Sequence, residues 1–330
     1  MSFDKVKGQG AAIRILKDEL DSGRIHHAYL LTGKEGVGKQ GLALEFTKAI
    51  LCQEQGVGAC DKCLTCRKID HSNHPDVRII SIEEGNSIKI DQIRELQKDI
   101  AYKPYESHRK VYIITDADKV TTEAANSLLK TLEEPPDHGV IILLAEEVDK
   151  LLPTVISRCQ QIQLNKISDS IIEKEIEKYG FNEEVSKLIA RLADGSLGRA
   201  ISLLDDEDFL ENRKKILKTL YKLPELSAVD IFKQVDFIIS ILNKKDDFPL
   251  FYLILSWYRD IILYNQGYDR EIVNFDCYKW IKLQSEHYSL EELISIVKLV
   301  NNIKRYLERN VKKDLALQVL LFKIRAKRVE

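Results

Sequence analysis

A glycine-rich stretch near the start of the chain has the residue types and spacing of a phosphate-binding loop. Its candidate ligand-binding residues are Gly33, Gly36, Gly38 and Lys39. Glycines let consecutive backbone N–H groups turn toward phosphate oxygens, and a lysine at this spacing reaches the outer phosphates of a nucleotide. The stretch follows an expected strand at 28–32 and opens an expected helix at 41–51, which is the setting such a loop requires. A chance Gly/Lys turn is the alternative.

The magnesium-binding half of such a site is incomplete. The position after Lys39 should carry a Ser or Thr hydroxyl, but it is Gln40, whose longer amide does not reproduce the geometry of this strictly octahedral ion. A second strand should end in an Asp for Mg²⁺ and a Glu to orient water. The apolar run 111–114 ends instead in Thr115-Asp116-Ala117, so one carboxylate is missing or misplaced in either register. A misplacement of about 1 Å can cost about a hundredfold in rate, so we expect no hydrolysis here.

Four of the six cysteines fall close together, at Cys52, Cys60, Cys63 and Cys66. Four thiolates are enough for a closed, tetrahedral Zn²⁺ site that fastens a loop and does no chemistry. An iron–sulfur cluster would favour a further Cys-Pro, whereas Arg67-Lys68 follows. Structural zinc is therefore the leading interpretation, with unligated thiols and a cluster as alternatives.

Length and composition limit what kind of chain carries these motifs. At roughly 100–200 residues per domain, 330 residues predict two or three domains. The net charge is −2, so no overall positive field draws the chain to nucleic acid, and a DNA contact would need a local patch. No apolar run approaches the roughly 18 residues of a membrane span, and the first residues lack an apolar signal core. We expect a cytoplasmic protein without membrane contact.

The expected elements place the motifs in an α/β domain followed by helices. Residues 1–164 alternate helical patterns with short apolar runs at 28–32, 77–80, 111–115 and 140–145. Runs without polar alternation fit strands buried on both faces of a parallel sheet. Asn182 and Ser196 can cap successive helices in a small domain at 165–208. Helical patterns such as 250–265 then predict an all-α domain at 209–330.

Together these residues resemble the clamp-loader branch of the AAA+ ATPases, the ring subunits that serve bacterial DNA polymerase III. The resemblance covers most of the first two expected domains and is thinner in the last. Its specific motifs are Ser157-Arg158-Cys159 and Leu132-Glu133-Glu134-Pro135-Pro136. The match also includes His74-Pro75-Asp76, Gly195-Ser196-Leu197-Gly198-Arg199-Ala200 and the four-cysteine module at 52–66. It implies a RecA-like AAA+ domain with a parallel sheet and a zinc module, a three-helix lid and an all-α collar domain for oligomerisation.

The resemblance also implies roles for two arginines. In this family the Ser-Arg-Cys arginine, here Arg158, points across a subunit interface at the γ-phosphate held by a neighbour, where such a group is worth ~10³–10⁵ in rate. An ordinary surface salt bridge, worth ~0–1 kcal/mol, is the alternative. Arg199 corresponds to the sensor-2 arginine, which approaches the subunit's own nucleotide in active relatives. A helix-surface arginine that supports the lid is the alternative for Arg199.

The departures from the motor subunits decide the expected function. Those subunits keep the loop Ser/Thr, the Asp-Glu pair and a polar sensor-1 residue, whereas this chain has Gln40, Thr115-Asp116 and Ala145-Glu146. We expect a subunit of the DNA polymerase III clamp loader without ATPase activity of its own, with binding of ATP or ADP left open. Its partners would be the gamma/tau motor and delta subunits of a hetero-pentameric ring, and through them the sliding clamp and primer-template DNA. The alternatives are an ATP-hydrolysing gamma/tau-type or other active AAA+ subunit and a stand-alone zinc-bearing interaction protein.

Overall fold

The computed structural model describes residues 2–54, 58–242, 249–308 and 311–327. The chain divides into two compact units, Met1–Ser202 and Leu203–Glu330, which we call the sheet unit and the helical unit. The division into three domains at 1–164, 165–208 and 209–330 remains a prediction. Among the described residues, none of the helices combines the length and the apolar character needed to cross a membrane.

A parallel sheet of five strands forms the centre of the sheet unit, in the order β2-β3-β4-β1-β5. The strands are β1 (Ala28–Thr32), β2 (Val77–Ile80), β3 (Lys110–Ile114), β4 (Gly139–Ala145) and β5 (Gln160–Gln163). This confirms the predicted α/β fold with a parallel sheet. β1, β3 and β4 are buried throughout, as their apolar runs predict. The same prediction is wrong for β2, which lies at an edge of the sheet and exposes Arg78 and Ile79.

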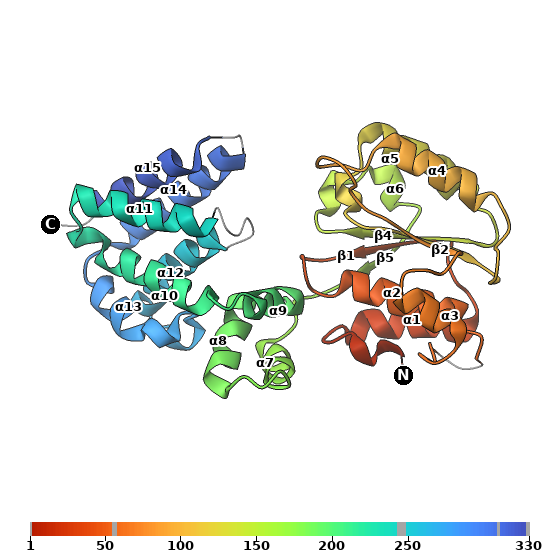
Figure 1. Ribbon diagram of the computed structural model, residues 1–330, viewed down its shortest axis with the longest axis horizontal. Helices are drawn as coiled ribbons and strands as arrows, with labels where there is room; N and C mark the ends of the chain where they lie inside the picture. Colours follow the sequence, from red (N-terminus) through yellow and green to blue (C-terminus); the bar gives the residue numbers. More distant parts are fainter. Residues whose placement is uncertain (1, 55–57, 243–248, 309–310, 328–330) are drawn as a thin grey trace. The chain divides into compact units, whose positions relative to one another are not determined.

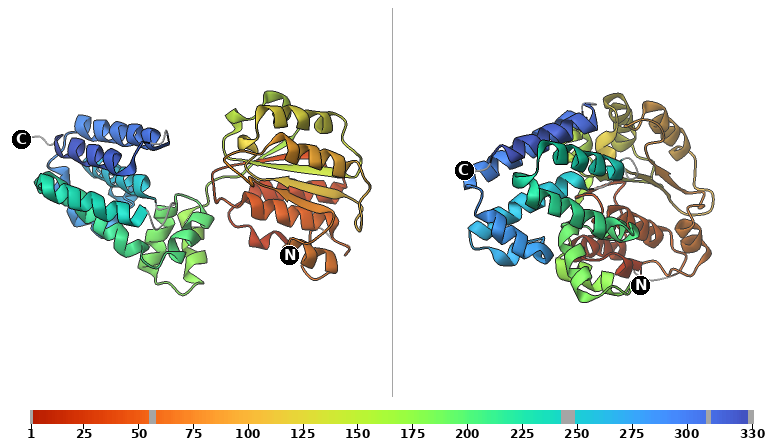
Figure 2. Two further views of the ribbon diagram at one scale, coloured as in Figure 1. Left: turned by 45° about the horizontal axis from the view of Figure 1, so that its top comes forward. Right: turned by 60° about the vertical axis from the view of Figure 1, so that its left-hand side comes forward.

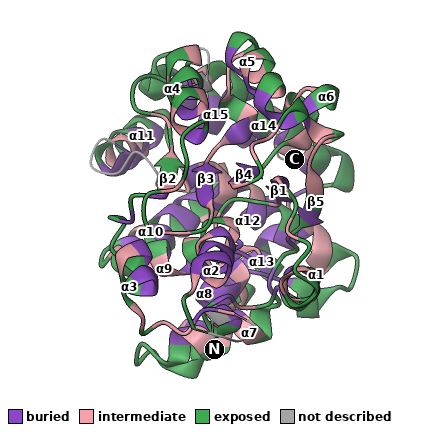
Figure 3. Cartoon of the chain, turned by 90° about the vertical axis from the view of Figure 1, so that its right-hand side faces the viewer, coloured by how far each residue is buried: buried purple, intermediate pink, exposed green. Residues whose placement is uncertain are grey.

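Helices cover both faces of this sheet (Figures 1 and 2). One face carries α1 (Gly10–Ser22), α2 (Lys39–Leu51) and α3 (Leu64–Asp70), and the other carries α4 (Ile90–Ile100), α5 (Thr122–Glu133) and α6 (Pro153–Ile156). Short 3-10 helices are η1 (Ser2–Lys5), η2 (Ala117–Lys119) and η3 (Val148–Lys150). Successive residues of a strand point to opposite faces, so Leu31 joins the core beneath α1 and α2 while Leu30 joins the core beneath α4 and α5. Figure 3 shows the central strands as buried and the outward helix surfaces as exposed.

Three helices follow the sheet: α7 (Asp169–Glu177), α8 (Glu183–Ala193) and α9 (Leu197–Asp205). The predicted capping residues begin α8 and α9. Asn182 Oδ1 accepts a hydrogen bond from the Val185 N–H at 2.9 Å, and Ser196 Oγ accepts one from the Arg199 N–H at 3.0 Å. We call α7–α9 the lid helices. The division between the two units falls within α9.

The described residues of the helical unit form helices and no strand, which confirms the predicted all-α fold. The helices are α10 (Phe209–Lys222), η4 (Leu223–Glu225), α11 (Ala228–Leu242), α12 (Leu250–Asn265), η5 (Asp269–Glu271), η6 (Phe275–Cys277), α13 (Tyr278–Ser285), α14 (Leu290–Glu308) and α15 (Lys313–Arg325). Trp257 on α12 is fully buried and donates its indole N–H to Gln284 Oε1 at 2.7 Å. This places Trp257 in the helical core.

An ion pair between the buried Arg213 and the partly exposed Asp276 fastens α10 to the segment before α13. The side chain of Arg213 is 1% exposed, and its two terminal nitrogens each lie 2.8 Å from an oxygen of Asp276. Nη2 of Arg213 also donates to Asn274 Oδ1 at 2.7 Å. Burial by itself would raise the pKa of Asp276, but the bound guanidinium outweighs burial and holds that pKa below its usual value.

Candidate functional site

The phosphate-loop residues lie between the end of β1 and the start of α2, as the sequence predicts. Gly36 and Gly38 have φ values of +71° and +101°, in the region that favours glycine. Gly38 directly precedes α2, so the free N–H groups of the first turn of that helix adjoin the loop. A loop and helix N-terminus of this kind provide the positive potential that attracts phosphate.

Lys39 lies against its own loop. Its Nζ donates to the carbonyl oxygens of Gly33 at 2.6 Å and Lys34 at 2.9 Å. Burial lowers the pKa of Lys39, and the nearby carboxylates of Glu146 and Asp118 offset this only in part. Gln40 is exposed in the first turn of α2.

The residues at the end of β3 are engaged within their own segment. The Thr115 hydroxyl donates to the Ile80 carbonyl oxygen at 3.3 Å. The Asp116 carboxylate accepts a hydrogen bond from Lys119 Nζ at 2.8 Å. Ala117 follows, so no carboxylate adjoins Asp116 where a magnesium-dependent hydrolase carries the second member of its Asp-Glu pair.

The lid helix α9 contacts the phosphate loop directly, which the sequence did not predict. The Gly198 N–H donates to the Gly36 carbonyl oxygen at 3.0 Å. A Cβ atom added at Gly36 would lie 2.1 Å from Ser196 Oγ and 3.2 Å from the Arg199 nitrogen, so the backbones meet without space for a side chain. Arg199 is thereby placed beside the loop, in the first turn of α9.

A second link joins the loop to the lid helices through charge. Asp194, at the end of α8, lies 3.2 Å from Lys34 Nζ and also pairs with Lys166. A cavity of about 330 Å³ lies at the carboxyl ends of β1, β4 and β5, and Lys34, Lys166 and Glu146 are among its lining residues. The end of β4 therefore presents Glu146 to this space.

The four clustered cysteines converge on one point. Their Sγ atoms lie within 4.8 Å of one another, and residues 55–57 of this module lie outside the described residues. Four sulfurs bound to one zinc ion would be about 3.8 Å apart, so small side-chain adjustments suffice for a tetrahedral site. Cys52 ends α2, Cys63 begins α3, and Cys66 is buried within α3. The four cysteines can thus hold a metal ion between two helices.

Backbone hydrogen bonds prepare part of this cluster for metal binding. Cys60 Sγ accepts hydrogen bonds from the N–H groups of Lys62 at 3.4 Å and Cys63 at 3.2 Å. They lower the pKa of the Cys60 thiol to about 7. Burial raises the pKa of Cys52 and Cys66, a cost that a cation bound among thiolates would offset.

A buried lysine beside the cysteines also escaped sequence analysis. The side chain of Lys48 on α2 is 0% exposed and lies 2.6 Å from Glu45, 2.6 Å from Asp61 and 3.0 Å from Asp70. Burial lowers the pKa of Lys48, but these three carboxylates outweigh it and hold the pKa above its usual value. Because Asp61 lies between Cys60 and Cys63, Lys48 ties the cysteine module to the helix that begins at the phosphate loop.

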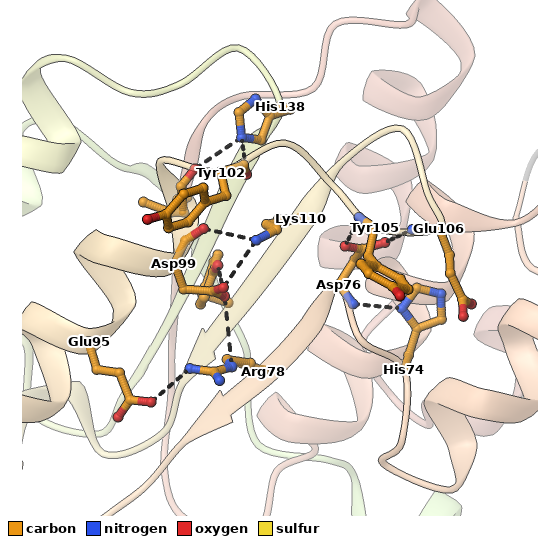
Figure 4. A network of polar contacts seen from close by, with 12 residues as sticks. His74, Asp76, Arg78, Glu95, Asp99, Tyr102, Tyr105, Glu106, Lys110 and His138 are labelled. Carbon is orange, nitrogen blue, oxygen red and sulfur yellow. Dashed lines mark hydrogen bonds and ion pairs between the residues drawn. The ribbon is translucent and has the colours of Figure 1, made fainter.

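The His-Pro-Asp motif orders the chain before β3 (Figure 4). Asp76 accepts hydrogen bonds from the N–H groups of Tyr105, Glu106 and Ser107 at 2.6–2.8 Å. His74 is buried, and its Nε2 lies 3.3 Å from Ser107 Oγ. These contacts fix backbone and give the motif a structural role.

Arg158 lies outside the phosphate-loop region, in the turn between α6 and β5. Its side chain is 33% exposed. Nη1 donates to the Thr154 carbonyl oxygen at 2.8 Å, and Nη2 lies 2.7 Å from Glu133 Oε1. Among the described residues, Arg158 therefore contacts its own helix α6 and the end of α5, and none of the phosphate loop.

Comparison with known proteins matches the N-terminal and C-terminal parts of the chain to two families whose descriptions name the same subunit. The family described as "DNA polymerase III, delta subunit" matches residues 8–168, and the one described as "DNA polymerase III, delta subunit, C terminal" matches residues 207–326. DNA polymerase III subunit delta' of Bacillus subtilis is 31% identical over 92% of this chain and 92% of its own length.

Other relatives are gamma and tau subunits of DNA polymerase III. DNA polymerase III subunit tau of Escherichia coli is 36% identical over 62% of this chain, which is 32% of tau. A crystal structure of a DNA polymerase III gamma subunit-related protein from Thermotoga maritima shares the fold, with a TM-score of 0.56 at 20% identity, and the match covers 96% of this chain and 99% of that one. The full-length match and the two family matches together show that the chain belongs to the delta' subunit family of DNA polymerase III.

Proposed function

We propose that this chain is a clamp-loader subunit that hydrolyses no ATP itself and lends Arg158 to ATP held by a neighbouring subunit. The observation that carries the proposal is a contrast between two sites of the sheet unit. Arg158 is partly exposed, with its guanidinium held by its own chain. The end of β3, in contrast, carries Asp116 followed by Ala117, and Asp116 is already bound to Lys119.

Arg158 has the chemistry that phosphoryl transfer requires. When water attacks the γ-phosphorus of ATP, the bond to the bridging oxygen breaks and negative charge spreads over the phosphoryl and leaving oxygens. An arginine stays protonated at any physiological pH and presents several N–H donors to such oxygens. Supplied from an adjacent subunit, it stabilises the transition state by ~10³–10⁵ in rate. The neighbour would provide the Mg²⁺, the phosphate loop and the attacking water.

The phosphate loop of this chain then has a structural part. We propose that the loop keeps the shape of a nucleotide-binding loop, formed by Gly33, Gly36, Gly38, Lys39 and Gln40. Gly36 and its neighbours would serve to bind the first turn of α9. Arg199 supports this contact from the first turn of α9. Whether ADP or ATP can enter beside Lys39 is measurable by direct titration of the isolated chain.

The metal in the cysteine module is, in this proposal, zinc. Four thiolate donors with no open coordination position suit Zn²⁺ in a structural role. The ion would connect the end of α2, through Cys52, to α3, through Cys66. It takes no part in the proposed ATP chemistry.

The proposed partners follow from the family and its relatives. The ring would contain gamma/tau motor subunits and a delta subunit in a hetero-pentamer, working in the cytoplasm. Through that ring the chain would act on the sliding clamp and primer-template DNA. The helical unit would supply the collar contacts that hold the subunits together.

An ATPase assay on the isolated chain separates this proposal from an active motor subunit, the alternative that the identity to tau favours. We expect no more ATP turnover from the wild-type chain than from Lys39→Ala. Mixing the chain with gamma/tau and delta subunits should yield one complex by size-exclusion chromatography. Turnover by the isolated chain that disappears in Lys39→Ala would establish the active alternative, and failure to assemble would support a stand-alone protein.

A further inference from the structure

The contact between Arg158 and Glu133 joins two motifs that are separate in the sequence. Nη2 of Arg158 lies 2.7 Å from Oε1 of Glu133, the last residue of α5. The side chain of Glu133 is 50% exposed, but its backbone is fixed because Thr131 and Leu132 just before it are buried. Glu133 therefore offers Arg158 an anchored partner at the surface.

The location of Glu133 is unusual for a carboxylate. The C-terminal end of a helix carries partial negative charge, which disfavours an acidic side chain and favours a basic one. Glu133 ends α5, and Glu134 follows it. A nearby cation offsets this unfavourable placement, and Arg158 is the cation that Glu133 contacts. The pairing thus gives Glu133 a reason to be at this position.

The contacts leave part of the guanidinium available. Nη1 is bound by the Thr154 carbonyl oxygen at 2.8 Å and lies 3.5 Å from Ser157 Oγ, and Nη2 is bound by Glu133. A guanidinium has five N–H donors, so Nε–H and one hydrogen of Nη2 stay available for an external oxyanion. No described residue of this chain bonds to Nε of Arg158.

We propose that Glu133 is a positioning residue that holds Arg158 in the orientation it needs to reach the ATP of the adjacent subunit. This inference rests on the proposed role of Arg158 in trans. A long arginine side chain in the turn after the four-residue helix α6 would otherwise lose much rotational freedom when it binds phosphate. Fixing it beforehand removes that cost from the reaction, and loss of such positioning slows catalysis without weakening nucleotide binding.

The test measures DNA-stimulated ATP hydrolysis in the reconstituted clamp-loader complex. The turnover lost in Arg158→Ala defines the Arg158-dependent activity. Glu133→Ala should lower the kcat of that activity by about tenfold with an unchanged KM. Glu133→Gln, which keeps an oxygen acceptor in place, should retain most of it. Glu134→Ala is the matched control, because the adjacent carboxylate has no side-chain partner among the described residues, and it should behave as wild type.

A double variant distinguishes positioning from an independent effect. If Glu133 acts through Arg158, adding Glu133→Ala to Arg158→Ala changes nothing further. Assembly and the unfolding temperature should stay those of the wild type in every variant. Wild-type activity of Glu133→Ala, or a further loss in the double variant, overturns the role of Glu133 while leaving that of Arg158 intact. Wild-type activity of Arg158→Ala overturns both.

Discussion

The Gly198 N–H donates to the Gly36 carbonyl oxygen at 3.0 Å, so the first turn of α9 rests on the phosphate loop. Neither glycine leaves space for a larger residue, since a Cβ at Gly198 would lie 3.1 Å from Gly36 Cα. The loop that in an ATPase encloses phosphate here also holds a lid helix. This contact requires glycine at positions 36 and 198 whether or not the loop takes part in nucleotide turnover.

Replacing Gly36 should therefore destabilise the fold. In Gly36→Ala the new Cβ would displace Ser196 Oγ from the Arg199 N–H, which removes a helix cap worth about 1 kcal/mol. The positive φ of Gly36 adds strain, and we expect a total loss of about 2 kcal/mol. Gly41→Ala, in α2 with no atom within 4 Å of its added Cβ, should instead stabilise by up to about 1 kcal/mol. Urea denaturation followed by circular dichroism compares them, and equal stability of the two variants would refute the contact's importance.

Lys48→Met should have a lower free energy of unfolding than Lys150→Met, the same substitution at an exposed lysine. Removing the buried ammonium leaves Glu45, Asp61 and Asp70 close together with only the exposed Lys5 nearby in the described part of the chain, 3.8 Å from Glu45 and 3.6 Å from Asp61. We expect this to cost about 3 kcal/mol. Lys150→Met is the control, because the exposed Lys150 pairs with Glu147 alone among the described residues, and its loss should cost less than about 1 kcal/mol of stability. Thermal and urea unfolding at neutral pH measure both. If Lys48→Met is as stable as Lys150→Met, the pairing of Lys48 with the three carboxylates does not stabilise the fold.

The sequence predicted the sheet and the cysteine cluster because both depend on local patterns. Apolar runs mark β1, β3 and β4, and the spacing of Cys60, Cys63 and Cys66 brings three sulfurs together within one turn-rich segment. The edge position of β2 depends on which strands pair, and its sequence of three apolar residues and Arg78 does not determine that pairing.

The contacts that sequence analysis missed join distant segments. Lys48 is separated by thirteen residues from Asp61, and Glu133 by twenty-five from Arg158. The available signals were a lysine between the apolar residues Phe46 and Ile50 of a helix and an acidic residue at a helix end. The burial of Lys48 and the position of Glu133 are each explained by a partner elsewhere in the fold.

The cysteine module should bind one equivalent of zinc per chain. Cys60→Ser should lose most of this metal, whereas Cys277→Ser, which alters a buried cysteine of the helical unit, should retain it. Zinc should also be released on acidification, because protons compete with the metal for thiolates. Elemental analysis of the purified proteins measures the metal. A wild-type chain that contains no zinc when prepared without chelators, or that contains iron instead, would contradict this assignment.

The Arg213–Asp276 pair predicts a pH dependence in the helical unit. The pKa of Asp276 is lowered in the folded chain, so its stabilisation is complete above the unfolded value of about 3.9 and is lost as the pH falls through the lower folded value. Asp276→Asn should lower the free energy of unfolding by about 3–5 kcal/mol at pH 7. The difference in unfolding free energy between this variant and the wild type should become smaller below about pH 4.

Fluorescence during urea unfolding reports on this unit, because both tryptophans lie in it. Asp236→Asn, an exposed change on α11, is the control and should match the wild type at each pH. If the difference in unfolding free energy between Asp276→Asn and the wild type stays constant across the acid range, the ion pair is not the cause of that difference.

The most direct test of the proposed function compares two variants in the same reconstituted clamp loader. DNA-stimulated ATP hydrolysis is measured with Lys39→Ala, which alters this chain's own loop, and with Arg158→Ala, which alters the residue lent to a neighbour. We predict wild-type turnover for Lys39→Ala, and for Arg158→Ala a loss of about 10³-fold at the one interface that it serves. The reverse result, with Lys39→Ala impaired and Arg158→Ala unaffected, would show that this subunit hydrolyses its own ATP and lends nothing.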